Sequence, residues 1–367
     1  MTVKNWICAL WLAGMVLLGL PASAQVEIID QAGRTVRLEQ PAQRIFFSTP
    51  GDFTIMAMLE ENPARRIVGW NHWRLDKHTL NHWRSIDPEA FDRIRKMVID
   101  GPQNLSAEAL IALEPDLVVL DHYFRNATQT IERLGKAGIP VAILDLEADL
   151  RQQNPTEGLE KMAILIGREQ RGKEVAEFFT QHVHRITSRV EALRNRQASL
   201  PAVLMEPHAG SAPCCMSVGA GVLMGDLVLM AGGKLIGSEI VEGLSGQLSA
   251  EYVITSDPAI YIGTGGRHIE NRGGLLLGPG VDAKASRASL QRVIRRTGLA
   301  QTSAVRQRHT YGIWHSGYPI INLELIATWL HPELFSDVDP AATLAELNRR
   351  FMNKPLDGIF WITPDTE

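Results

Sequence analysis

Histidines recur at one kind of position along this 367-residue chain. Five of the 11 histidines lie just after short apolar segments with the composition of β-strands. Because ligands of parallel sheets bind outside the carboxyl ends of the strands, side chains at these positions can converge on one site. Imidazole is a common ligand of transition metals, so such histidines can complete the coordination of a metal ion. The five are His72, His122, His208, His268 and His315, of which all but His268 are predicted metal ligands.

Aromatic and basic side chains accompany several of these histidines. Aromatic rings can pack against a catechol, porphyrin or corrin, and guanidinium groups such as Arg74 and Arg267 can neutralise an anionic chelate with paired donors. The pattern therefore predicts a site for a metal chelate whose open coordination positions are filled by imidazole or phenolate. The predicted ligand-binding residues are Trp70, His72, Trp73, Arg74, His122, Tyr123, His208, Arg267, His315 and Tyr318.

Two other kinds of chemistry are compatible with the same strand ends. A bare divalent cation could be bound by His72, His122 and His208 together with a carboxylate from Glu206 or Asp121. A metal-dependent hydrolase could hold zinc with His122, Asp121 and His208, and use Glu206 as a general base. The sequence contains no H-E-x-x-H and no G-x-S-x-G motif, so it favours a binding protein over an enzyme.

The segments that carry these residues alternate between short strands and helices. Asp52 and Ser106 each stand where they can cap a helix. Strands that alternate with helices predict parallel βαβ units. The predicted strands cover residues 44–47, 66–69, 116–120, 140–144, 201–205, 259–262 and 311–314, and the predicted helices cover 52–61, 106–113, 128–137, 224–231 and 323–330.

A segment without strand signals separates two similar halves. Residues 168–196 contain no proline and one glycine, with apolar residues at helical spacing, so they predict a helix about 40 Å long. Leu-Ser-Ala-Glu occurs at 105–108 and again at 248–251, each time before a helix and then a strand. The sequence therefore predicts an α/β fold of two related α/β lobes joined by a single long connecting helix.

The N-terminus predicts export. A basic start, an apolar run from Trp6 to Leu20 and small residues up to Ala24 indicate a cleavable signal peptide over residues 1–24. The apolar run is shorter than the roughly 20 residues that span a bilayer. In an oxidising compartment, the adjacent Cys214 and Cys215 could form a vicinal disulfide or remain free thiols.

The charge balance narrows the possible partners. The chain has 37 Lys+Arg against 41 Asp+Glu, a formal net charge of -4. We find no basic stripe, so nothing in the sequence indicates binding to nucleic acid. With 45% hydrophobic and 21% charged residues, the composition is that of a folded globular protein rather than a disordered one.

Short motifs also follow one another in a characteristic order. They are Asp30 to Val36, Arg44-Ile45, Arg66 to Gly69, Leu105 to Leu120, Leu134 to Val141, Ala231 to Gly233, Leu330 to Phe335 and Asp339-Pro340. In this order the chain resembles the periplasmic binding proteins of ABC importers for iron-siderophore, haem and cobalamin complexes. The resemblance covers nearly all of the chain after the predicted signal peptide.

The resemblance implies a function and its partners. It implies two small α/β lobes joined by one long helix, with the ligand cleft between the lobes. It also implies a monomeric periplasmic receptor, not an enzyme, that has no intrinsic cofactor. Such a receptor delivers a metal chelate, with iron as the expected metal, to an ABC importer permease in the inner membrane. Family members dock through one surface acid on each lobe, and the equivalent positions here are Glu108 and Glu251. The predicted parts are the signal peptide 1–24, the N-terminal lobe 25–154, the connecting helical segment 155–196 and the C-terminal lobe 197–367.

Overall fold

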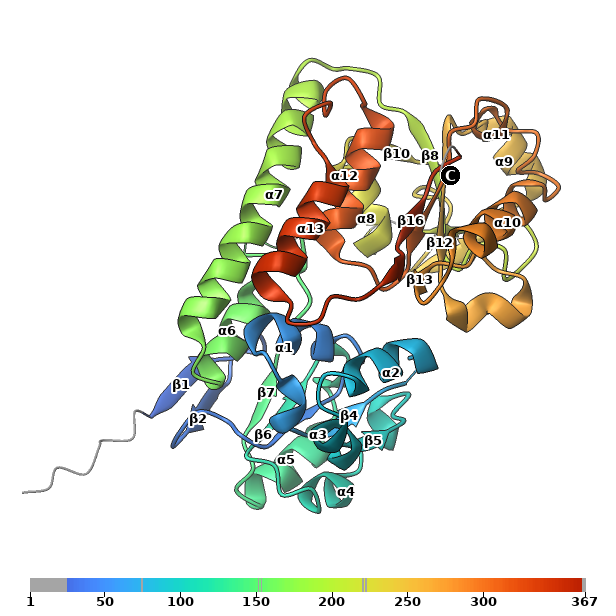
Figure 1. Ribbon diagram of the computed structural model, residues 1–367. Helices are drawn as coiled ribbons and strands as arrows, with labels where there is room; N and C mark the ends of the chain where they lie inside the picture. Colours follow the sequence, from blue (N-terminus) through green and yellow to red (C-terminus); the bar gives the residue numbers. More distant parts are fainter. Residues whose placement is uncertain are drawn as a thin grey trace, which may run out of the picture.

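Two five-stranded sheets form the centres of two lobes (Figure 1). The computed structural model describes residues 25–364 except 74, 151, 153, 220 and 222, so the predicted signal peptide and Arg74 lie outside the described residues. The N-lobe sheet is parallel, in the order β5 (Arg95–Met97), β4 (Ile67–Asn71), β3 (Ile45–Phe47), β6 (Leu117–Leu120) and β7 (Val141–Ile143). The C-lobe sheet has the order β10 (Lys234–Leu235), β8 (Ala202–Glu206), β12 (Ile260–Gly265), β14 (Thr310–Trp314) and β16 (Trp361–Ile362), with β16 antiparallel.

Helices flank both sheets, which explains the continuous apolar character of the central strands. Every residue of β6 and β12 is buried. The N-lobe helices are α1 (Asp52–Leu59), α2 (Lys77–Arg84), α3 (Pro88–Arg93), α4 (Ala107–Ile111), α5 (Thr128–Lys136) and α6 (Glu157–Leu165). The C-lobe helices are α8 (Leu223–Met230), α9 (Ala250–Ser256), α10 (Ala283–Ile294), α11 (Ser303–Arg306), α12 (Pro319–Leu330) and α13 (Pro340–Phe351).

Three antiparallel strand pairs lie outside the main sheets. They are β1 (Val26–Ile29) with β2 (Thr35–Leu38), β9 (Met216–Val218) with β11 (Ser245–Gln247), and β13 (Gly278–Pro279) with β15 (Gly358–Ile359). Before β9, Cys214 and Cys215 are joined by a disulfide, one of the two alternatives that the sequence left open. In the described part of the chain, no helix combines the length and the apolarity that crossing a membrane would require.

The predicted connecting helix is α7 (Glu169–Asn195), which runs along one side of both lobes (Figure 1). Its buried face carries Val175, Phe178, Phe179, Ile186 and Val190. These residues belong to one apolar core that is continuous from the N-lobe into the C-lobe. The preceding helix α6 packs against β1 of the N-lobe, so α7 is the element that spans the two lobes.

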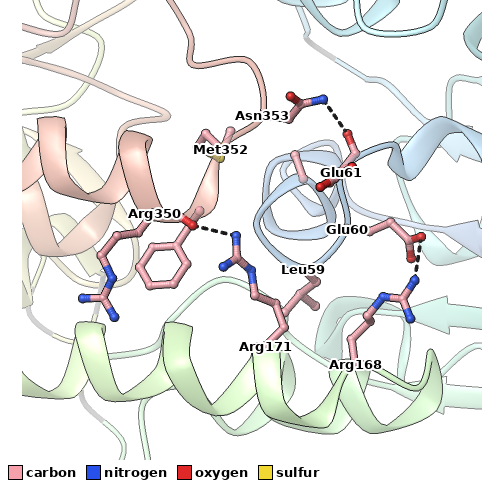
Figure 2. A pocket seen from close by; sticks show the side chains of 10 residues that line it. Leu59, Glu60, Glu61, Arg168, Arg171, Arg350, Met352 and Asn353 are labelled. Carbon is pink, nitrogen blue, oxygen red and sulfur yellow. Dashed lines mark hydrogen bonds and ion pairs between the residues drawn. The ribbon is translucent and has the colours of Figure 1, made fainter.

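Hydrogen bonds connect the two lobes around a hollow of about 590 Å³ on the α7 side of the molecule (Figure 2). Arg171 of α7 donates from Nε to the carbonyl of Met58 at 2.9 Å and from Nη2 to the carbonyl of Arg350 at 2.8 Å. Met58 belongs to α1 of the N-lobe and Arg350 to α13 of the C-lobe, so one side chain holds both lobes. Asn353 adds a direct bond to the carbonyl of Glu61, at 3.3 Å.

The central strands and α7 lie where the sequence predicted them. Two predictions about residues near these elements differ from the structure. Asp52 was predicted to cap α1, but the cap position is Gly51 and forms no side-chain bond, while Asp52 is the first residue of the helix. The carboxyl of Asp52 is buried instead. The predicted strand at 66–69 extends to Asn71, so Trp70 belongs to the strand rather than to the loop after it.

We predict that Arg171→Ala loosens the connection between the lobes. Losing two charge-assisted hydrogen bonds should lower the free energy of unfolding by about 2 kcal/mol. It should also broaden the distribution of distances between spin labels placed on the two lobes. Arg189→Ala is the matched control, because Arg189 of α7 binds only C-lobe partners, Leu334 and Asp337. Equal broadening in both variants, or none in either, would contradict the role of Arg171.

Candidate functional site

The carboxyl ends of the two sheets enclose a chamber between the lobes. Its volume is about 280 Å³. The N-lobe contributes the loops after β3 and β4 and a segment beyond β7, the C-lobe contributes the loop after β14, and Phe179 of α7 also lines it. The wall is mainly apolar. The lining residues are Thr49, Pro50, Gly51, Thr54, Ile55, Trp73, Leu75, Thr79, Trp83, Glu147, Ala148, Phe179, Trp314, Ser316, Gly317, Tyr318, Pro319 and Leu356.

Large aromatic side chains from both lobes line this chamber. Trp73 and Trp83 come from the N-lobe, and Trp314 and Tyr318 from the C-lobe. The Tyr318 hydroxyl is buried and has no hydrogen-bond partner, and this burial raises its pKa. A buried hydroxyl without a partner is costly in an empty site, and a ligand in the chamber could satisfy it.

Trp70 was predicted to contact ligand, and the structure corrects this. It is fully buried, its ring lies 5.0 Å from that of Phe53, and its Nε1 donates to the carbonyl of Thr49 at 3.1 Å. Trp70 therefore supports the loop after β3 from inside the N-lobe. Strand residue Trp70 points into the core, whereas Trp73 lies beyond the strand end and reaches the chamber.

An acidic pocket of about 250 Å³ adjoins the aromatic chamber. The two hollows share Thr49, Glu147 and Ala148. Five carboxyl side chains line this pocket, all from the N-lobe, and no described lining residue of either hollow is Lys or Arg. The lining residues are Thr49, Asp52, Asp121, His122, Tyr123, Asp145, Leu146, Glu147, Ala148 and Asp149.

Asp52 and Glu147 are the carboxyls with the least compensation. Asp52 is 2% exposed and its Oδ2 has no hydrogen-bond partner. Burial, and then the nearby charges of Asp121 and Glu147, hold the pKa of Asp52 well above its usual range. Glu147 is an exposed residue of this pocket and lies against Gly51, where even a methyl group would collide with its carboxylate. Loss of solvation, and then Asp145 and Asp121, raise the pKa of Glu147. Neither acid forms an ion pair with a described residue.

The two predicted histidines of the N-lobe, His122 and His72, lie in different surroundings. His122 lines the acidic pocket, where its Nδ1 lies 2.9 Å from Oδ2 of Asp145. Tyr123 beside it is exposed and also lines the pocket. His72 is half-buried after β4, with its backbone N–H bonded to the carbonyl of Met97, and it lines neither hollow.

The three predicted histidines of the C-lobe, His208, His268 and His315, form a cluster at the ends of β8, β12 and β14. His268 Nε2 lies 2.9 Å from His208 Nδ1, and the rings of His208 and His315 are 4.3 Å apart. His315 Nδ1 lies 3.2 Å from the hydroxyl of Thr264. This cluster follows the prediction that strand ends gather histidines, but it stands in the C-lobe alone.

The four predicted metal ligands do not converge. Within the described residues, no group of three or more His, Cys, Asp or Glu side chains is placed to hold a metal ion. Glu206, the alternative ligand and general base, is buried and paired with Arg296, with oxygens 2.5 and 2.9 Å from the guanidinium. It also accepts a bond from the Tyr261 hydroxyl. Glu206 is therefore part of a buried C-lobe network and is not available to a metal or a water nucleophile.

Arg267 does not line the cleft as predicted. Its Nε donates to the carbonyl of Pro279 at 3.2 Å, a second donor binds the carbonyl of Gly280, and Glu270 lies 3.5 Å away. These bonds fix the loop after β12 to β13. The acidic residues Asp145, Glu147 and Asp149 were not predicted from the sequence, although they follow a predicted strand as the histidines do.

The two predicted docking acids are exposed residues at matching positions. Glu108 lies in the first turn of α4 and Glu251 in the first turn of α9. Ser106 and Ser249 cap these helices by accepting bonds from backbone N–H groups, as the repeated motif predicts. Both helices lie on the outer parts of their lobes, away from α7 (Figure 1). Glu108 forms an exposed ion pair with Arg133 at 2.5 Å.

We predict that Asp52→Asn stabilises the protein at high pH. A carboxyl with a raised pKa in the folded state stabilises it at low pH, and this contribution is lost as pH rises from the usual value, 3.8, through the folded-state pKa. We would measure the free energy of unfolding by urea at about pH 4.5 and at about pH 8. Between these two pH values, the variant should lose less stability than the wild type.

The control for this experiment is Asp87→Asn. Bonds from Ala90, Asn62 and Arg65 lower the pKa of Asp87 to about 2, so its contribution is present at neutral pH and is lost on acidification. At about pH 8, Asp87→Asn should therefore lower the free energy of unfolding, whereas Asp52→Asn should raise it. A wild-type pH dependence that Asp52→Asn leaves unaltered would show that Asp52 is ionised in the folded protein.

Comparison with known proteins gives related sequences and folds. Residues 67–315 match the family described as periplasmic binding protein. The TroA-like periplasmic binding protein FepB from Veillonella parvula is 26% identical, with a TM-score of 0.81 over 92% of this chain and 99% of that chain. A cobalamin-binding protein of Halobacterium salinarum is 26% identical over 237 residues, which span 64% of this chain and 57% of that relative.

A more distant likeness concerns the fold alone. The molybdate-bound MolA of Haemophilus influenzae is 18% identical, with a TM-score of 0.65 over 90% of this chain and 98% of that chain. The same two lobes and cleft thus occur with very different sequences. Since the family match covers both lobes and the helix between them, this chain belongs to the family of periplasmic binding proteins that it resembles in sequence.

Proposed function

We propose that this protein is a periplasmic receptor that binds a ferric siderophore or a similar metal chelate between its lobes and delivers it to an ABC importer permease. Members of its family are solute-binding receptors rather than enzymes. The observation that carries the choice of cargo is the aromatic chamber, where Trp73, Trp83, Trp314 and Tyr318 come from opposite lobes. Aromatic faces suit a ligand with an extended organic surface.

The size of the cleft also supports an organic cargo. The chamber of about 280 Å³ and the adjoining pocket of about 250 Å³ share a wall, so one ligand can occupy both. Ligand pockets for drug-sized molecules measure roughly 300–1,000 Å³. A bare ion needs several converging ligand atoms and no apolar chamber. The described residues offer the chamber and no such metal-ligand group, which favours a chelate over a bare divalent ion.

A hydrolase is disfavoured on the same grounds. Its proposed zinc ligands His122 and Asp121 belong to the N-lobe, whereas His208 belongs to the histidine cluster of the C-lobe. The general base in that scheme, Glu206, is buried against Arg296. No observation therefore supports turnover, and binding followed by delivery is the function that the residues can perform.

We predict that a ferric chelate quenches tryptophan fluorescence with a Kd near or below a micromolar, and that its metal-free form does not. The titration panel includes ferric hydroxamates and catecholates, haemin, cobalamin, and free Zn²⁺, Mn²⁺ and Ni²⁺. Trp73→Ala should weaken binding about threefold to tenfold, because an aromatic contact contributes about 0.5–1.5 kcal/mol.

Trp329→Phe is the matched control for Trp73→Ala. Trp329 stacks on Tyr311 with ring centroids 4.3 Å apart and lines neither hollow of the cleft. Its replacement should leave the affinity unchanged. A response to free ions alone would favour a metal-ion receptor, and silence across the panel would contradict the proposed cargo.

We further predict that Glu108→Lys combined with Glu251→Lys impairs delivery without impairing binding. Both acids are exposed and remote from the chamber lining, so chelate affinity should be unchanged. Uptake of radiolabelled chelate by cells with the cognate permease should fall at least tenfold, because charge reversal on both lobes repels the basic partner expected there. Glu191→Lys, an exposed acid on α7, is the control, and normal uptake by the double variant would remove the docking assignment.

A further inference from the structure

The charge of the cleft bears on which chelates this receptor accepts. Two basic residues, Arg74 and Arg267, suggested an anionic cargo. Arg74 lies outside the described residues, and Arg267 is held by the carbonyls of Pro279 and Gly280 and lines neither hollow. The C-lobe wall of the chamber consists of uncharged residues. The charge that a ligand meets from the described residues therefore comes from the N-lobe, and it is negative.

Some of this negative charge is compensated within the protein. Asp145 pairs with His122, and Asp121 accepts bonds from the Thr49 hydroxyl at 2.6 Å and from the backbone N–H of Tyr123 at 2.8 Å. Asp121 and Asp145 thus have local partners for their oxygens. Glu147 forms no hydrogen bond or ion pair of this kind with a described residue, and it borders both the aromatic chamber and the acidic pocket.

Asp52 is an independent indication that a ligand enters the acidic pocket. It lines the pocket, is 2% exposed, and keeps one carboxyl oxygen without a hydrogen-bond partner. Buried polar groups in folded proteins are nearly always satisfied, so an orphaned carboxyl oxygen at a pocket wall points to a missing donor. A cationic donor such as an ammonium group would satisfy this oxygen and reduce the repulsion among its acidic neighbours.

We infer that this receptor selects neutral or positively charged metal chelates over anionic ones, with the chelate body in the aromatic chamber and a cationic group of the ligand in the acidic pocket beside Asp52 and Glu147. This inference rests on the proposed function and narrows its substrate class. An anionic chelate in the same place would lose its solvation and face the acidic side chains of this pocket, whereas a pendant ammonium would gain charge-assisted hydrogen bonds.

The test compares ligands that share one ferric chelate and differ at a pendant group, which sets their charge. A linear ferric trihydroxamate with a pendant primary amine carries one positive charge, its N-acetyl derivative is neutral, and its N-succinyl derivative carries one negative charge. Affinities are measured by fluorescence quenching and calorimetry at low salt. We expect them to fall by at least about fivefold for each step from cation to anion, since the ligand charge lies within several ångströms of the carboxylates.

Two variants tie this preference to the pocket. Glu147→Gln should reduce the ratio of cation to anion affinity by about threefold or more. Asp52→Asn should do the same, because a bound cation favours the ionised form of Asp52 and asparagine cannot ionise. Raising the salt should reduce the ratio in the wild type. Glu132→Gln is the matched control, because Glu132 is an exposed acid of α5 that lines neither hollow. Its ratio should equal that of the wild type.

The outcomes separate this inference from the function on which it rests. Equal affinity for the three charge forms, or stronger binding of the N-succinyl form or of a ferric triscatecholate, would overturn the charge selection and leave a chelate receptor. A preference that survives both pocket variants would overturn the assignment to Asp52 and Glu147. Failure to bind any chelate of the panel would overturn the proposed function and the inference together.

Discussion

The position of the two lobes relative to each other depends on α7 and on Arg171, which binds carbonyls of both lobes from one side chain. Because apolar residues of α7 belong to a core continuous through both lobes, separating the lobes would expose that core as well as break these bonds. The strand ends consequently face each other across a fixed gap. Binding in this cleft is expected to need only a small closure, because a large opening would expose the core that the lobes share.

This constraint divides the cleft into two parts with different chemistry. The aromatic chamber is built by both lobes and α7, so a ligand that fills it contacts all three and favours their present arrangement. The acidic pocket belongs to the N-lobe alone. Apolar contact in the chamber would supply most of the binding energy. Charge in the acidic pocket would supply the selection between ligands of different charge. The two properties can therefore be changed separately.

The sequence predicted the elements whose signals are local. The apolar runs of β3, β6 and β12 and the proline-free α7 were recognisable by pattern, and the capping serines marked α4 and α9. Strands of two residues, such as β10 and β16, carry no such signal, because their pairing depends on neighbours distant in the chain. The same limit applied to Arg267, whose carbonyl partners belong to another loop.

Several of the aromatic residues that line the hollows were predicted from the sequence, and most of the acidic ones were not. The rule that ligands lie beyond strand ends placed Trp73, His122 and Tyr318 at the cleft, and it applies equally to the acids after β7. Trp70 was misplaced because β4 runs two residues further than its apolar pattern.

Asp52 looked like an ordinary helix cap, a role in which its carboxylate would have stabilised α1. In the folded protein this carboxyl is buried without full compensation, which costs stability. Asparagine would fill the same space without that cost, so the acid is best understood as a group that a bound ligand completes.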